Sequence, residues 1–268
     1  SADRILPRNP LRHIHSTVGG NCKNDSTMEK LLITLIFVFL MSCGNNSPKT
    51  NNEMKQNPKN EIAENSKEKF ENITSKFISE FDISEMLLDK YFGAFGQNYQ
   101  RIDLKVKSIN KKIDSPSEYI LTGTTILKNK EVPFEGVIKI NTVKKSNLNP
   151  YQIDDSTYYT IEINCNYQFV EDKSISGSGI YQGTLDFTLV LDNENKLHND
   201  LWEWWGDGYS NFQFQGTWTS SKGTEYKCIF GDGRLENSGD LDIGDGVFMP
   251  NEKYYSYGWK DYDKQLNE

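Results

Sequence analysis

The stretch 201–209, Leu-Trp-Glu-Trp-Trp-Gly-Asp-Gly-Tyr, places three indoles beside two carboxylates. If this stretch is a strand, alternation puts Trp202 and Trp204 on one face and Glu203 on the other. A flat indole near Glu203 or Asp207 suits a sugar or another amphipathic ligand, although indoles also fill cores and barrel ends. Trp202, Glu203, Trp204 and Asp207 are therefore our candidate ligand-binding residues.

A second candidate site is the glycine-rich stretch 231–246, which holds five carboxylates and one arginine. Oxygen ligands on a flexible loop are what calcium requires, so Asp240, Asp242 and Asp245 are candidate metal ligands. Their spacing does not match that of an EF-hand loop. The alternative is a solvated acidic loop that is ordered by pairing Arg234 with a neighbouring carboxylate.

Catalytic motifs are not found. The sequence contains no nucleophile elbow, no metal-spaced His/Cys set and no phosphate loop. His198 lies beside a predicted turn and is most simply a solvated loop residue. Carboxylates are plentiful, so a glycosidase-like pair stays open until such a pair is placed in space. We name no catalytic residue and expect a protein without enzymatic activity.

An apolar, uncharged run at 31–41 ends next to a cysteine. The run is too short to span a membrane as a helix, which takes about 20 residues, but it has the roughly 7–15 residues of a signal-peptide apolar region. Met28 and Lys30 precede it. A buried apolar element beside a chance cysteine is the alternative. The stretch 40–43, Leu-Met-Ser-Cys, resembles the lipobox of bacterial lipoproteins. That resemblance implies cleavage before Cys43, a diacylglyceryl group on its thiol and membrane attachment through acyl chains such as palmitate.

This reading divides the chain into five parts. Residues 1–27 contain no Met and hold three of the chain's five Arg, so we expect a non-native or mistranslated leader, with a basic targeting arm as the alternative. The parts that follow are a signal peptide at 28–42, a lipid-anchored disordered tether at 43–60, a helical segment at 61–93 and an antiparallel β domain at 94–268. We expect the protein to be exported and anchored to the cell envelope, at the outer membrane.

Charge limits the partners. The chain carries a net charge of -8, and from Cys43 onward 25 basic and 35 acidic residues leave -10. Nucleic acid is excluded as a partner because phosphate binding requires clustered Lys and Arg. An acidic surface is also not drawn to anionic lipid headgroups, so attachment to the membrane depends on the acyl chains.

Two cysteines remain downstream of Cys43, and export would place them in an oxidising compartment. A disulfide between Cys165 and Cys228 would close a loop of about 60 residues, worth roughly 4 kcal/mol in the chain-entropy model. Two separate buried thiols are the alternative, since spacing alone does not show whether the Cα atoms come within range.

The elements that must position these residues begin with two helices. Apolar residues at helical spacing predict an amphipathic helix over 61–81. A second helix has Ser84 as its N-cap, 85–92 as its body and Gly93 as its stop. Beyond Arg101 the hydrophobic pattern changes to period two. The predicted strands are 101–109, 118–127, 132–140, 158–170, 179–191, 201–205, 212–220 and 225–230, and turn residues separate them.

A recurring pattern favours a barrel over a sandwich. Three strands share the form aromatic-Glu/Gln-Gly-Val/Thr-apolar, centred on Gly136, Gly183 and Gly216. A mid-strand glycine marks a bulge, a bend or a close backbone approach, and bends of this kind close small barrels. We expect the aromatic two residues earlier to cover each glycine. Gly216-Thr-Trp218 is also similar to the G-x-W of lipocalins, which bears on shape alone.

The sequence therefore predicts a mainly β, antiparallel barrel-like domain on a lipid anchor. As a whole it resembles uncharacterised cell-envelope lipoproteins in layout. The expected role is non-catalytic binding of a small ligand, a glycan or a protein at the envelope. A carboxylate-based, glycosidase-like envelope hydrolase and a structural or assembly lipoprotein are the alternatives. We expect no cofactor unless the acidic loop binds calcium.

Overall fold

The structure is a computed structural model that describes residues 70–146, 158–199, 208–260 and 262. All of these belong to one compact unit, Lys59–Glu268. The predicted leader, signal peptide and tether lie outside the described residues, as does the first part of the predicted helical segment.

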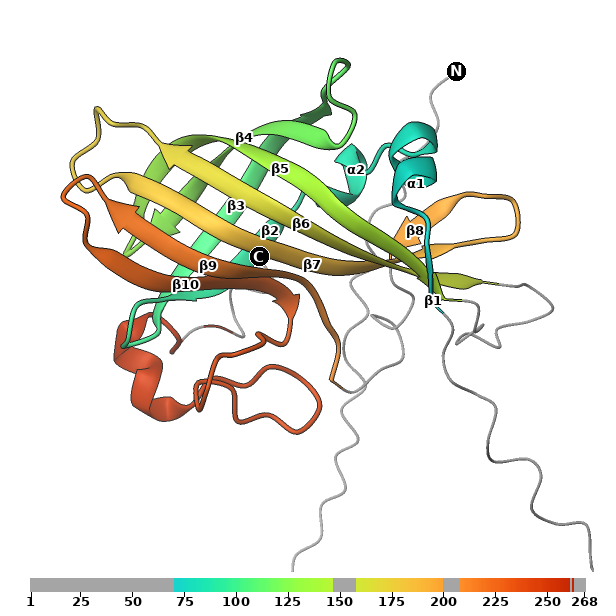
Figure 1. The fold of residues 1–268 in the computed structure, drawn as a ribbon. Helices are drawn as coiled ribbons and strands as arrows, with labels where there is room; N and C mark the ends of the chain where they lie inside the picture. The colour runs from blue at the N-terminus through green and yellow to red at the C-terminus, as the bar shows by residue number, and fades with distance from the viewer. Residues whose placement is uncertain (1–69, 147–157, 200–207, 261, 263–268) are drawn as a thin grey trace, which may run out of the picture. The chain divides into compact units, whose positions relative to one another are not determined.

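Eight antiparallel strands form a closed barrel (Figure 1). Each strand pairs with the next along the chain, β7 pairs with β9, and β10 returns to β2, so every barrel strand has two neighbours. The predicted barrel is confirmed. The barrel strands are β2 (Lys90–Phe95), β3 (Gln100–Lys111), β4 (Glu118–Leu127), β5 (Lys130–Ser146), β6 (Tyr159–Glu171), β7 (Gly179–Leu191), β9 (Ser210–Ser220) and β10 (Glu225–Gly233). Two short strands extend the wall, β1 (Phe70–Asn72) on β5 and β8 (Leu197–Asn199) on β7.

Period-two alternation sets which side chains enter the barrel. Along β6, Ile161, Ile163 and Cys165 are buried while the residues between them face outward. The predicted turns hold the hairpins: Lys128 and Asn129 both have positive φ, 51° and 64°, as a two-residue β-hairpin turn requires.

Barrel glycines sit opposite aromatic residues of the neighbouring strand. The register pairs are Gly93–Phe230, Gly123–Phe134, Gly136–Phe169 and Gly183–Tyr167. At Gly136 an added Cβ would collide with the Phe169 ring, so the ring occupies the space that a side chain would fill. Our expectation that the covering ring comes from two residues earlier is wrong for these pairs. Across the pair the two Cβ positions lie about 5 Å apart, closer than positions two residues apart on one strand.

These rings fill the lumen. Phe134 stacks on Phe169 at 4.8 Å between ring centroids. Tyr167, which contacts Phe169, lies 5.3 Å from Phe214, and Phe214 lies 5.2 Å from Tyr91. A chain of ring contacts thus crosses the barrel from β5 to β2. The space in which a wider barrel would hold a small ligand is occupied by side chains.

Helices cover one end of the barrel. Helix α1 (Thr74–Glu80) and helix α2 (Ser84–Leu87) place Phe77, Ile83 and Leu87 in the barrel core, each no more than 1% exposed. The Lys111 ammonium donates to the carbonyls of Ile78 and Phe81, at 2.6 and 2.5 Å. We call this the helix end.

The opposite end is closed around a buried carboxylate, Glu171, which is 4% exposed. It accepts hydrogen bonds from the Trp218 indole and the Gly179 amide, both at 2.9 Å, and from the Thr125 hydroxyl at 2.5 Å. Because these donors come from β9, β7 and β4, one carboxylate ties together three strands of the wall. We call this the tryptophan end.

The predicted helix over 85–92 is wrong beyond Leu87. Residues Lys90–Phe95 form β2, which pairs with β3 and β10 and closes the barrel. Tyr91 faces the lumen, while Phe92 faces outward to a second apolar cluster. Aromatic residues that alternate between two buried faces favour a strand, and this pattern outweighs the local helix signals.

The second cluster joins the C-terminal segment to the outside of the barrel. Leu241, Phe248 and Trp259 pack on Phe92 and Ile229, which face outward from β2 and β10. The segment includes a 3-10 helix, η2 (Glu252–Tyr257), and the Trp259 indole donates to the Tyr99 carbonyl at 2.6 Å. The aromatic C-terminal residues therefore cover the outer wall of the barrel at β2 and β10 and do not close one of its ends.

We predict that Gly136→Ala lowers the free energy of unfolding by about 1–3 kcal/mol, because the new methyl group meets the Phe169 ring. Gly123→Ala should cost more, since its Cβ comes closer to the backbone carbonyl of Lys105 than the Cβ at Gly136 comes to that of Gln168. Urea unfolding of Gly136→Ala, Phe169→Leu and the double variant measures the coupling. Additive costs in that cycle would contradict the pairing.

Buried tyrosines make the barrel sensitive to alkali. Burial raises the pKa of Tyr119 from 10.0 to about 12 and raises that of Tyr167 and Tyr181 well above the ordinary value. The unfolded chain releases these protons near pH 10 while the folded barrel keeps them. The stability that Tyr119 contributes is thus fully present below pH 10 and falls by at most about 1.4 kcal/mol per pH unit up to pH 12. Urea unfolding across this range should show that the free energy of unfolding falls less steeply with pH for Tyr119→Phe than for the parent. An unchanged dependence on pH would contradict the raised pKa of Tyr119.

Candidate functional site

Trp202, Glu203, Trp204, Asp207 and Cys43 lie outside the described residues, so these site predictions stay predictions. The described chain resumes at Gly208, whose amide donates to the Gly246 carbonyl at 2.5 Å. The two stretches that carried binding chemistry in the sequence therefore meet at this point of the fold.

The acidic loop is ordered by its own donors. Asp242 receives the Arg234 guanidinium at 2.6 Å and the Gly244 and Met249 amides at 3.0 and 3.1 Å. Asp240 pairs with Lys253 and accepts from the Tyr254 hydroxyl.

These contacts engage the carboxylates of Asp240 and Asp242, and calcium binding there stays a prediction. Their oxygens face ammonium, guanidinium, hydroxyl and amide donors, whereas a calcium site needs them directed at one centre. Asp245 is exposed, and its carbonyl, not its carboxylate, faces Arg234. Across the described ranges, no group of three or more His, Cys, Asp or Glu is arranged to hold a metal ion. The pairing of Arg234 with Asp242 is the contact that the alternative reading expects.

The disulfide between Cys165 and Cys228 is not formed in the structure, where both are free and buried. Cys165 lies on β6 and Cys228 on β10, three strands apart around the wall. Neighbouring strands are about 4.8 Å apart, so this separation exceeds the roughly 7 Å between Cα atoms that a disulfide tolerates. Burial raises the pKa of both thiols.

His198 lies on β8 and its imidazole is 2.7 Å from the Asp192 carboxylate. This hydrogen bond, together with the Lys196 and Glu194 amides, lowers the pKa of Asp192. The pair fastens the β7–β8 turn. It approaches no nucleophile or second base that would give it a catalytic role, within the part of the chain that the structure describes.

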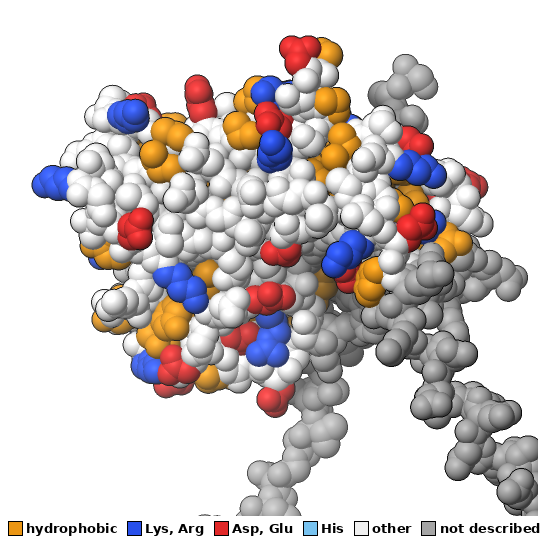
Figure 2. Space-filling view, in the orientation of Figure 1, with side chains coloured by type: hydrophobic (Ala, Val, Ile, Leu, Met, Phe, Trp, Pro, Cys, Tyr) orange, Lys and Arg blue, Asp and Glu red, His pale blue; other side chains and the backbone are white. Residues whose placement is uncertain are grey.

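The outer face of β6, β7 and β9 is a polar grid. Strand register aligns outward residues in four rows of three, and we call this surface the polar wall. From the helix end, the rows are Glu162–Thr188–Asn211, Asn164–Asp186–Gln213, Asn166–Thr184–Gln215 and Gln168–Gln182–Thr217. Seven amides, three threonines and two carboxylates occupy its twelve positions. Figure 2, drawn toward this face, shows a broad area that is neither charged nor hydrophobic, with charged side chains around it.

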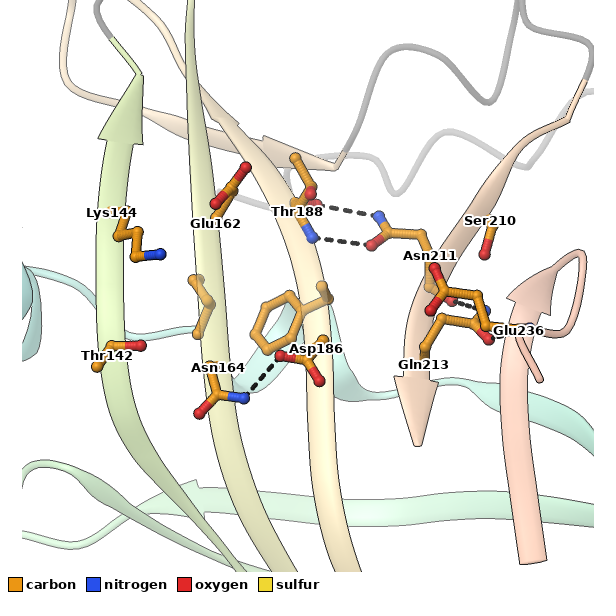
Figure 3. Close-up of a pocket in the computed structure, with 12 residues that line it drawn as sticks. Thr142, Lys144, Glu162, Asn164, Asp186, Thr188, Ser210, Asn211, Gln213 and Glu236 are labelled. Carbon is orange, nitrogen blue, oxygen red and sulfur yellow. Dashed lines mark hydrogen bonds between the residues drawn. The ribbon is translucent and has the colours of Figure 1, made fainter. Parts of the chain in front are cut away.

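Two hollows lie on this wall. The first, which we call the groove, has a volume of about 250 Å³ and opens over the first two rows, with Lys144 and Glu236 at its sides (Figure 3). The second, which we call the saddle, lies over the last two rows, where Gly183 and Gly216 pair across β7 and β9.

The groove exists because β7 and β9 part at the helix end. Their ladder stops at the Asp186–Gln213 pair. Beyond it the Asn211 side chain takes the place of the backbone hydrogen bonds of the ladder. Its NH₂ group donates to the Thr188 carbonyl at 3.0 Å, and its oxygen accepts from the Thr188 backbone amide at 2.8 Å. Figure 3 shows this two-bond bridge crossing the gap.

The amides of β9 have a structural role. Gln213 donates to the carbonyls of Asn211 and Arg234 and accepts from the Glu236 amide, and Gln215 donates to the Glu236 carbonyl. These contacts hold the chain that follows β10 against the wall.

The amides of β6 and β7 are available to a ligand. Asn166, Gln168 and Gln182 are exposed, and within the described residues their side chains make no hydrogen bond to protein. Asn164 is held in place, since it donates to Asp186 at 2.6 Å and accepts from Asn141 at 3.0 Å. The wall thus combines fixed polar groups with free ones.

This arrangement suits recognition of hydroxyl groups. A side-chain amide offers two donors and one acceptor oxygen, so it can pair with a hydroxyl in either sense. The groove also holds three carboxylates, Glu162, Asp186 and Glu236, against one ammonium, Lys144. Its charge opposes an anionic ligand.

Comparisons of the chain with protein-family models, with curated proteins and with solved structures find no match. The molecule is thus classed by its own fold, as a closed eight-stranded antiparallel barrel with a filled lumen and a polar outer wall. Among the described helices, none is long and apolar enough to cross a membrane.

Sequence analysis missed the polar wall as a site, although its signal is present. In Thr-Ile-Glu-Ile-Asn-Cys-Asn-Tyr-Gln, residues 160–168, every second residue is polar and all but one of these are uncharged. That pattern predicted a half-buried strand. It becomes a surface only when register sets β6, β7 and β9 side by side.

We predict that the folded Cys22→Ser/Cys43→Ser variant does not react with Ellman's reagent, even in mild alkali. Burial keeps the remaining thiols, Cys165 and Cys228, protonated. Two thiols per chain should react after unfolding without reductant. An unfolded chain with no reactive thiol would restore the disulfide.

Proposed function

We propose that this protein is an exported, lipid-anchored binding module that holds an uncharged glycan on its polar wall. The observation that carries the proposal is the grid of amides and hydroxyls on β6, β7 and β9, which occupy ten of twelve positions. Asn166, Gln168 and Gln182, toward the tryptophan end, are exposed and unpaired, whereas Asn211 and Gln213 are buried.

Closure of the barrel supports an outer site. Aromatic rings fill the lumen, the helices cover one end and the Glu171 contacts close the other. The two hollows described above both lie on the outer wall.

The chemistry of the wall favours a glycan over other partners. The buried centre of a protein–protein interface is rich in aromatic and other apolar side chains, which this wall does not present. Nucleic acid would require clustered Lys and Arg. A neutral polyhydroxyl ligand needs many modest, bidirectional hydrogen bonds, which amides and threonines supply.

The anchor part of the proposal rests on sequence. The apolar run ending at Cys43 supports acylation of that residue and attachment to the cell envelope, at the outer membrane. Buried CH₂ groups contribute roughly 0.8 kcal/mol each, so several acyl chains hold a protein stably. The barrel would then present its wall to envelope glycans.

A glycosidase-like hydrolase is the second candidate, because Glu162, Asp186 and Glu236 all line the groove. A general acid in such enzymes needs an apolar enclosure that keeps its proton. Asp186 and Glu236 are exposed, and Glu162 is half-buried on the open outer wall. This setting favours binding without cleavage.

We predict that neutral linear oligosaccharides bind the protein and that Asn166→Ala, Gln168→Ala and Gln182→Ala each weaken binding roughly 2- to 10-fold, the loss of about one neutral hydrogen bond. Isothermal titration measures the dissociation constants. The matched control is Asn110→Ala, which removes an exposed amide from β3, outside the wall.

The same titrations should show no binding of oligomers of uronic acids, because the groove is acidic. Product analysis of each mixture separates binding from hydrolysis: new reducing ends would favour the hydrolase. If no neutral glycan binds, the proposed function is wrong.

A further inference from the structure

We infer that the glycan is a linear chain of several sugar units lying along β6 and β7, from the groove to the saddle, and not a single terminal sugar. This inference rests on the proposed function and names the form of its ligand.

The two hollows are one continuous surface. The row Asn164–Asp186–Gln213 belongs to the groove, and the next row, two residues further along each strand, supplies Asn166 and Thr184 to the saddle. No row separates them. At about 3.3 Å per residue, the six steps from Glu162 to Gln168 span roughly 20 Å. That length exceeds a single sugar ring and matches a short oligosaccharide.

The surface is bounded at both ends. Past Gln168–Gln182 the next outward pair on β6 and β7 is apolar, Val170–Ile180. Beyond Glu162–Thr188 the next pair is Thr160–Val190, in which Val190 is fully buried. The hydrogen-bonding surface therefore has a defined length of four rows. A ligand gains contacts as it grows along these rows and stops gaining them when it reaches the boundary.

Free amides lie at the saddle, away from the groove. Asn166, Gln168 and Gln182 are exposed without protein partners among the described residues, whereas the groove side chains Asn164 and Asn211 are already hydrogen-bonded. A sugar confined to the groove would leave those three amides unused. A chain that also crosses the saddle would engage them.

The experiment measures dissociation constants of the full chain for one series of neutral linear oligosaccharides, from monosaccharide to octasaccharide. We expect affinity to rise at least about tenfold from disaccharide to pentasaccharide and then to level off. The saddle variant Gln168→Ala/Gln182→Ala should bind the disaccharide almost as the parent does but lose most of the gain with length. Asn110→Ala, as control, should follow the parent.

Two results would overturn the inference in distinguishable ways. In the first, the monosaccharide binds as tightly as the longest oligomer and the saddle variant weakens binding of all lengths equally. The site would then bind a single terminal sugar, so the inference would be wrong while the proposed function would still hold. If no member of any neutral series binds, the proposed function falls and the inference with it. Circular dichroism of the saddle variant establishes that it is folded in either case.

Discussion

The packing of aromatic rings against glycines of the neighbouring strand is the constraint on which the rest of the structure depends. Where Gly136 faces Phe169, or Gly123 faces Phe134, the strand can bend and the ring takes the vacated space. Repeated around the barrel, these pairs curve the wall and fill the lumen. Because side chains fill the interior and both ends are closed, a ligand can bind only on the outer face of the described barrel.

The outer face is not uniform. On β3 and β5 the exposed positions include Lys105, Glu135 and Lys139, an ordinary charged surface that favours solubility. On β6 and β7 most of the outward positions of the polar wall carry Asn, Gln and Thr, and two carry carboxylates, Glu162 and Asp186. Solubility does not require this change of chemistry within one barrel. A surface that must pair with uncharged polar groups does, and that difference supports a binding role for the polar wall.

Much of the fold could be predicted from the sequence, and the site could not. Period-two alternation locates seven of the barrel strands because inward and outward environments differ at every residue. Local helix signals, with Ser84 as N-cap and Gly93 as stop, predict a helix where β2 lies. Tyr91 and Phe92 are buried on opposite faces of β2, and only the distant C-terminal cluster supplies the second face. Asp240 and Asp242 pair with Lys253 and Arg234, and the polar wall forms only through the register of its strands. Both depend on contacts between residues that a local sequence pattern does not reveal.

The most direct test of a wall-bound glycan is the side-chain amide NMR spectrum of the ¹⁵N-labelled protein during titration with a neutral linear oligosaccharide mixture. The NH₂ resonances of Asn166, Gln168 and Gln182 should shift when the ligand is added. The indole NH resonance of Trp218, at the tryptophan end, and the NH₂ resonances of Asn110 should not shift. Shifts confined to residues of the barrel interior or of the C-terminal segment, with the polar wall unchanged, would contradict a wall-bound glycan.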